Sequence, residues 1–140
     1  MPIKISDLDG GLGNLILGSG VIDDKEYLKA FREHLMQDAA KFRRYRYSLG
    51  DWTQVTQVNV TNDAIHQIAD LCKKVSSVNP DAVVAVAAKS DVVFGLSRMS
   101  QLLMDETGWE HKVFRNREDA EEWIKAKVRE KHGIADLTMV

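Results

Sequence analysis

Four histidines and one cysteine are the side chains of this sequence best suited to bind a metal or to act as a nucleophile. They are His34, His66, His111, His132 and Cys72. The histidines form no His-x-x-x-His pair, and a single cysteine excludes the Cys-x-x-Cys pair that many metal sites use. We therefore expect no metal site and no cofactor.

Cys72 is expected to lie in the core. It shares one helical stripe with Ile65, Ile68 and Val75, and a thiol buried among apolar groups keeps a high pKa and stays unreactive. No Gly-x-Ser-x-Gly motif presents a serine nucleophile. The sequence therefore indicates no catalytic residue.

The glycines of "DLDGGLGN" (residues 7–14) invite a phosphate-binding interpretation. Gly11 and Gly13 have the spacing of a dinucleotide-binding motif, but Ile16 stands where that motif needs its third glycine. The glycines also precede an expected strand instead of a helix. We expect them to be turn residues.

The most basic stretch is "KFRRYRY" (residues 41–47), in which cations alternate with aromatic rings. One interpretation is a patch for nucleic acid or anionic lipid. The other is a helix end, where cations are favourable, followed by a strand whose tyrosines point inward. The net charge of −2 favours the second interpretation, so no specific nucleic-acid partner is expected.

Gly95 lies in an expected helix that begins at Ser90 or Asp91. Glycine costs about 1 kcal/mol relative to alanine in a helix, so a compensating gain is expected. We favour close packing of another backbone against Gly95. The alternative is room for a ligand beside Phe94, with Arg98 one turn along to hold an anionic group.

Asp51 follows the end of an expected strand, where α/β proteins often carry site residues. The sequence places no second carboxylate opposite it, so acid–base catalysis is not expected. An exposed Trp52 would suit a partner anchor. Together with the helix above, these residues form the candidate binding surface, which comprises Asp51, Trp52, Thr53, Ser90, Asp91, Phe94, Gly95 and Arg98.

Composition is that of an ordinary globular chain of 140 residues, 44% hydrophobic and 29% charged. No signal-like segment opens the chain, and no apolar run is long enough to span a membrane. A single cysteine suits a reducing compartment. We expect a cytoplasmic protein that does not span a membrane.

Strands and helices alternate along the sequence in the order ββαβαβαβα. Strands are expected at residues 3–5, 15–20, 43–50, 82–88 and 111–114, and helices at 23–40, 61–75, 90–103 and 116–132. Such alternation predicts one α/β domain, a single-layer sheet with helices, mostly parallel with an antiparallel N-terminal strand. Residues 1–132 form the domain, and residues 133–140 form a tail that is either mobile or docked on a neighbour.

Three stretches together resemble the SpoIIAA-like (STAS/Sec14-like) branch of small bacterial proteins. They are "GSGVIDDKEYLKAFREHL", "VAVAAKSDVVFGLSRM" and "KVFRNREDAEEWI". The branch has no settled activity, while the wider fold serves in partner-binding switches of sigma-factor regulation, in anion transporters and in ligand binding. The phosphorylation signature of the switch proteins is absent from residues 50–67.

Because the sequence contains no catalytic constellation, we expect a non-enzymatic protein with one of two roles. The first is a protein-binding or regulatory module, with a homodimer as one expected assembly. The second is a carrier of a small apolar or amphipathic ligand, which the Sec14-like likeness suggests. The order of the strands in the sheet is left open by the sequence.

Overall fold

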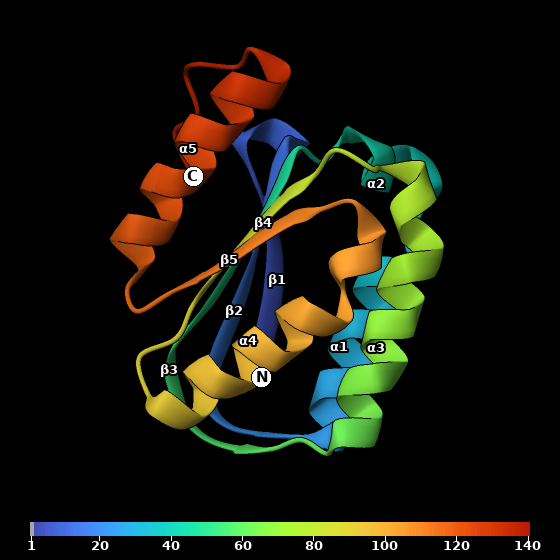
Figure 1. Ribbon diagram of the computed structural model, residues 1–140, viewed down its shortest axis with the longest axis vertical. Coiled ribbons are helices and arrows are strands. Elements are labelled where there is room, and N and C mark those ends of the chain that lie inside the picture. The colour runs from blue at the N-terminus through green and yellow to red at the C-terminus, as the bar shows by residue number, and fades with distance from the viewer. Residues whose placement is uncertain (1) are drawn as a thin grey trace.

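A five-stranded sheet forms the centre of the protein in the computed structural model, which describes residues 2–140 (Figure 1). The strands lie side by side in chain order: β1 (Ile3–Leu8), β2 (Gly13–Asp23), β3 (Tyr47–Asn59), β4 (Val83–Ala87) and β5 (Glu110–Phe114). β1 runs antiparallel to β2, and the other neighbours are parallel. The expected α/β class and the antiparallel entry of the chain are confirmed.

Helices cover both faces of this sheet. They are α1 (Asp24–Leu35), α2 (Ala39–Arg44), α3 (Asn62–Val75), α4 (Asp91–Leu103) and α5 (Arg117–His132). Parallel strands that follow one another in the chain are also neighbours in the sheet, always in the same direction. The right-handed crossovers between them therefore carry α1, α3 and α4 over the same face. We call this the three-helix face. The last helix, α5, packs on the opposite face, the α5 face, as Figure 1 shows.

Side-chain caps begin the main helices where the sequence predicts them. The side chains of Asp23, Thr61, Ser90 and Asn116 each accept a hydrogen bond from the backbone N–H three residues later, over 2.8–3.2 Å. Such caps satisfy N–H groups that have no partner inside the helix. Local sequence therefore sets these four helix starts.

Several expected boundaries are wrong, because tertiary pairing decides them. The first two strands, expected at 3–5 and 15–20, extend over Ile3–Leu8 and Gly13–Asp23. The helix expected to continue to about residue 40 ends at Leu35, and α2 begins separately after Asp38, whose side chain caps it. The strand expected at 43–50 begins only at Tyr47 and continues to Asn59, since β2 pairs with it over that whole length. The β-branched residues of segment 53–58 are the sequence signal for this longer strand.

The basic stretch is a helix end, which confirms the favoured interpretation. Arg43 and Arg44 lie in the last turn of α2, while Tyr45 and Tyr47 are buried. Arg46 donates a hydrogen bond to the Arg43 carbonyl at 3.0 Å, so it satisfies one of the free carbonyls of the helix end.

The C-terminal tail docks on its own chain. Asp9, which follows β1, accepts hydrogen bonds from the backbone N–H and hydroxyl of Thr138, the N–H of Met139 and the hydroxyl of Tyr47. The Asp9 N–H in turn donates to the Val140 carbonyl at 2.8 Å. Met139 is thereby buried in the core of the α5 face. Burial alone would raise the pKa of Asp9, but the hydrogen bonds from Tyr47, Thr138 and Met139 lower it.

We expect Asp9→Asn to release this tail. The substitution keeps the size of the side chain and its tolerance of a left-handed backbone (φ 50°). It removes the negative charge of the carboxylate that accepts these hydrogen bonds. Because hydrogen bonds to charged groups contribute about 1.5–3 kcal/mol, urea unfolding should show a loss of about 1–3 kcal/mol. Hydrogen exchange at Thr138 and Met139 should become faster.

Asp136→Asn is the control for this prediction, because Asp136 is an exposed carboxylate of the same tail. It should change neither the unfolding free energy nor the exchange rates. Equal effects of the two variants would show that Asp9 does not anchor the tail.

Candidate functional site

The central strand β4 packs differently on its two sides. Val83, Ala85 and Ala87 point to the α5 face and are completely buried. Val84 and Val86 point to the three-helix face and remain partly accessible. A central parallel strand is normally buried on both faces, so the helices over Val84 and Val86 leave space beside the sheet.

This space is an apolar cavity of about 150 Å³ between the sheet and helices α1, α3 and α4. It lies between two separate apolar clusters of the three-helix face, one around Ile16, Ile22 and Val93 and one around Ile68 and Cys72. An apolar cavity of this volume accommodates a benzene-sized molecule.

A second chamber of about 90 Å³ adjoins the first. The two chambers share part of their walls, including Ile16, Phe31, Ser48, Cys72, Val84, Met104 and His111. The second chamber also contacts polar side chains, among them Asn14, His34 and Asn79. Both chambers therefore have mostly apolar walls with a few polar side chains.

Trp52 forms part of the cavity wall in a defined position. Its ring lies against the backbone of Gly18 on the neighbouring strand, where a Cβ atom would overlap with the indole ring. On its other side the ring stacks with Phe31 of α1, with ring centroids 6.2 Å apart. Trp52 is therefore half-buried and faces the cavity, whereas the role of partner anchor would need an exposed ring.

Most polar groups of the cavity wall already have partners. The Ser48 hydroxyl donates to the Asn14 side chain at 2.7 Å, and the Gln101 amide donates to the His111 carbonyl at 2.9 Å. The imidazole Nε2 of His111 is different, because it is buried and no protein group of residues 2–140 lies within hydrogen-bonding distance.

Burial sets the ionisation of the groups around the cavity. It lowers the pKa of His34 to about 4, assisted by the nearby charge of Lys41 and opposed by Asp7. It also lowers the pKa of His111 to about 4, with Asp105 opposing. Cys72 lies in the core as expected, and burial raises its pKa to about 12. The cavity wall is therefore uncharged at neutral pH at these positions.

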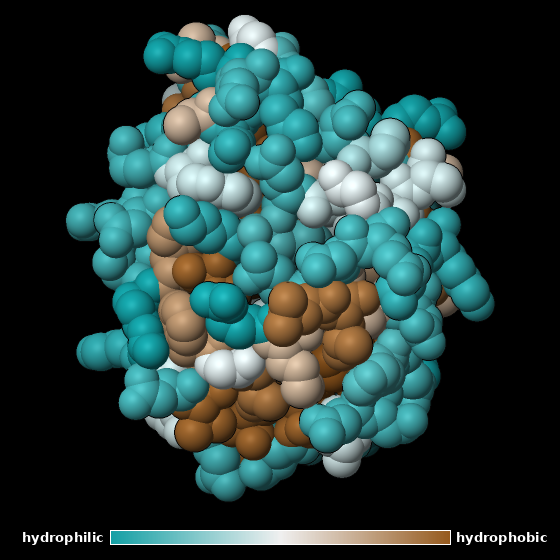
Figure 2. All heavy atoms as spheres, in the orientation of Figure 1, coloured by the Kyte–Doolittle hydropathy of each residue, from teal (hydrophilic) through white to brown (hydrophobic). Residues whose placement is uncertain are grey.

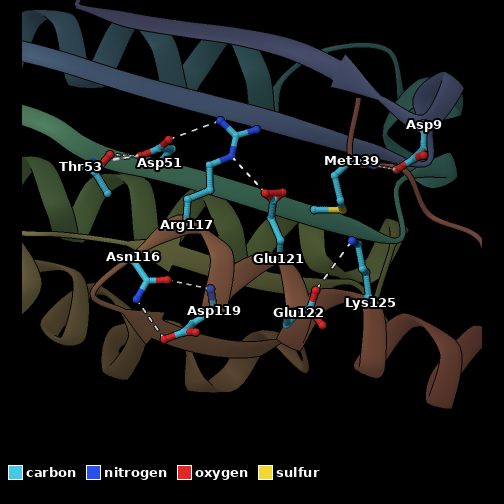
Figure 3. A network of polar contacts seen from close by, with 10 residues as sticks. All are labelled: Asp9, Asp51, Thr53, Asn116, Arg117, Asp119, Glu121, Glu122, Lys125 and Met139. Atoms are coloured by element: carbon cyan, nitrogen blue, oxygen red, sulfur yellow. Dashed lines mark hydrogen bonds and ion pairs between the residues drawn. The ribbon is translucent and has the colours of Figure 1, made fainter.

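The sheet separates the residues of the candidate surface. Asp51 lies within β3 and not after its end, and its buried side chain points to the α5 face. It accepts hydrogen bonds from the backbone N–H and the hydroxyl of Thr53, and it lies 3.4 Å from the Arg117 guanidinium, which also contacts Glu121 at 3.6 Å (Figure 3). This network joins the start of α5 to β3, and it lies on the side of the sheet away from Trp52.

The remaining candidate residues lie around the start of α4. Ser90 caps the helix, and Asp91 forms an ion pair with Arg115 at 2.8 Å. The Arg115 guanidinium also lies 4.0 Å from the centre of the Phe94 ring, which covers that ring from solvent. In place of Phe94, Val93 reaches the cavity.

The close packing expected at Gly95 is absent. Gly95 is exposed, and a Cβ atom there would meet nothing within 4 Å. Arg98 is exposed as well and does not line either chamber. The structure therefore gives no packing reason for the glycine, and the cavity lies against the inner side of α4, away from Gly95 and Arg98.

Sequence reasoning missed several residues that line the cavity, notably Tyr27, Phe31, Val86 and His111. Their spacing identifies the sides of the helices and strands that point inward, but it does not reveal a gap between those elements. For His111, the sequence pattern raises only metal binding or nucleophilic chemistry and does not indicate a place in a cavity wall. Within residues 2–140, no three His, Cys, Asp or Glu side chains are grouped closely enough to hold a metal ion. In the same part of the chain, no helix is long and apolar enough to cross a bilayer.

We expect acid to destabilise the fold through its two partly buried histidines, His34 and His111. Their folded pKa values of about 4 lie below the usual 6.5, so the unfolded chain binds more protons between these values and stability falls as pH falls. From pH 7 to pH 5, each histidine should account for about 1–2 kcal/mol. Urea unfolding at several pH values measures this. His34→Gln should remove about half of the effect, whereas the exposed control His66→Gln should leave it unchanged.

Comparison with solved structures identifies the type of fold. No family model and no curated protein matches the chain. Among solved structures, it is similar to an uncharacterized protein of the DUF3478 family with a SpoIIAA-like fold from Shewanella loihica PV-4. The TM-score is 0.53 at 16% sequence identity, over 87% of this chain and 91% of that one. The strand and helix arrangement described above is thus a SpoIIAA-like fold, as the sequence resemblance implied.

Proposed function

We propose that this protein binds a small apolar or amphipathic molecule in the cavity of the three-helix face. The observation that carries the proposal is the volume of about 150 Å³ between the sheet and the helices, with walls that are almost entirely apolar. Binding sites for small molecules are concave, mostly apolar and equipped with a few polar groups. The cavity and the adjoining chamber have these three properties.

Helix α4 is the wall best suited to admit a ligand. Val93 is its one buried residue, whereas α3 buries five: Ala64, Ile65, Ile68, Ala69 and Cys72. Elements with few buried apolar contacts open at lower free-energy cost than well-packed ones. The space is already partly open to the surface, and we propose that outward movement of α4 widens it to admit a ligand. We also propose that the protein is cytoplasmic, as expected from the sequence.

A cavity-filling variant tests the proposal. Ser100 lines the cavity from α4, and Ser100→Leu adds apolar volume there without interrupting the helix. We expect it to raise the melting temperature or leave it unchanged and to weaken binding of toluene or similar probes at least about tenfold. Binding is measured by the shifts of cavity methyl signals in NMR titrations.

Arg98→Leu is the matched control, because it places the same side chain on the exposed side of the same helix. It should leave probe binding unchanged. If it weakens probe binding as much as Ser100→Leu does, Arg98 belongs to the binding site. If the wild-type protein binds no apolar probe, the ligand proposal is wrong.

The second candidate function is binding of a protein partner through the outer side of α4. Val92 and Leu102 are exposed there to 66% and 64%, and Figure 2 shows apolar side chains gathered over the part of the surface that α4 occupies in Figure 1. Exposed apolar patches often mark interaction sites. A second copy of this chain is the partner that we propose, in line with the homodimer expected from the sequence.

Light scattering tests this second proposal. The wild-type protein should show the mass of a dimer at micromolar concentration, and the double variant Val92→Glu/Leu102→Glu should be a monomer, because two buried carboxylates per copy oppose association. Glu118→Lys/Glu122→Lys, an exposed pair on α5, is the control and should stay dimeric. If the wild-type protein is still a monomer at 100 micromolar, a homodimer with a dissociation constant of about 1 mM or lower is excluded.

A further inference from the structure

One wall of the cavity is the seam between α4 and β5. The residues that line it are Val93, Ser97 and Ser100 on the helix and His111 and Val113 on the strand. β5 is the last strand of the sheet and has a neighbouring strand on one side only (Figure 1). Outward movement of α4 therefore widens the cavity along this seam.

Arg115, the residue that follows β5, holds the first turn of α4 by its guanidinium group. This group forms the ion pair with Asp91 at 2.8 Å and donates a hydrogen bond to the Lys89 carbonyl at 3.2 Å. It also lies 4.0 Å from the centre of the Phe94 ring, in a cation–π contact. The Arg115 side chain thus spans the seam at the end where α4 begins.

Few other contacts fasten α4 to the rest of the protein. Val93 is its one buried residue. Farther along the helix, the Gln101 amide donates to the His111 carbonyl of β5 at 2.9 Å. Within residues 2–140, no hydrogen bond or ion pair other than those of Arg115 and Gln101 joins α4 to the sheet or to another helix. Elements with so few contacts open at low free-energy cost.

We propose that Arg115 is the latch of the cavity, a side chain whose contacts hold α4 against β5 and set the rate at which a ligand passes between them. This inference rests on the proposed ligand-binding function and adds how access to that site is controlled. The side chains of Arg115 and Asp91 are 50% and 94% exposed. An ion pair this exposed is weak, so the latch opens without disturbing the fold.

A latch of this kind changes rates and leaves affinity unchanged. Arg115 lines neither chamber, so its contacts are the same whether the cavity is empty or filled. Their loss therefore makes opening easier by the same free energy in both states. Entry and release accelerate by the same factor, and the dissociation constant, which is the ratio of the two rate constants, stays the same.

Arg115→Gln tests the proposal, because it removes the positive charge that the Asp91 carboxylate and the Phe94 ring attract. The probe is fluorobenzene, and line-shape analysis of its ¹⁹F NMR signals gives the rate constants of entry and release. Both should rise about 3- to 30-fold, as expected for the loss of one exposed ion pair and one cation–π contact. The dissociation constant should equal that of the wild type within error.

Arg98→Gln is the matched control, because it removes the same charge from an exposed position of α4 itself. It should leave both rate constants unchanged. Hydrogen exchange gives a readout that needs no ligand. The amides of Leu96 and Ser97 in α4 should exchange faster in Arg115→Gln, while that of Ile68 in α3 should keep its rate. Equal acceleration in both helices would show general unfolding and overturn the latch.

The outcomes separate the latch from the function on which it rests. If fluorobenzene does not bind to the wild type, the ligand-binding function is wrong and the latch falls with it. If it binds, but Arg115→Gln and Arg98→Gln have the same rate constants, the function stands and the latch alone is overturned. Weaker binding of the probe at an unchanged rate of entry would also overturn the latch, because it would place Arg115 in the binding site.

Discussion

The order of the strands is the constraint on which the rest of this structure depends. Four parallel strands follow one another across the sheet, from β2 to β5. Because right-handed crossovers in one direction always pass over the same side, α1, α3 and α4 share one face. The other face is left to α5, which follows the last strand, and to the C-terminal tail that Asp9 anchors.

The two faces consequently differ in how well they pack. On the α5 face, the small residues Ala85 and Ala87 of β4 let Ala120 and Ile124 of α5 come close, and all four are completely buried. On the three-helix face, α1 packs on β1 and β2, α4 packs on β3 and β5, and α3 lies between them. Together they leave the cavity above Val84 and Val86. Tight packing on one side stabilises the fold, so the other side tolerates a space that binding can use.

The same division explains why the candidate site differs from its sequence-based description. Neighbours on a strand point to opposite faces, so Asp51 and Trp52 are adjacent in the chain but separated by the sheet. Asp51 joins β3 to α5 through Arg117, whereas Trp52 reaches the cavity because Gly18 leaves room for its ring. The inner side of α4 meets the cavity through Val93, and its outer side, with Gly95 and Arg98, faces solvent.

Local signals in the sequence determined the α/β class, the starts of four helices at their capping residues, the antiparallel entry of β1 and the burial of Cys72. These depend on neighbours within a few residues or on the periodicity of one element. Tertiary structure alone decided the docking of the tail, the cavity and the unpartnered Nε2 of His111. Periodicity tells which side of an element points inward, but the distance between facing elements depends on how side chains distant in sequence fill the space between them.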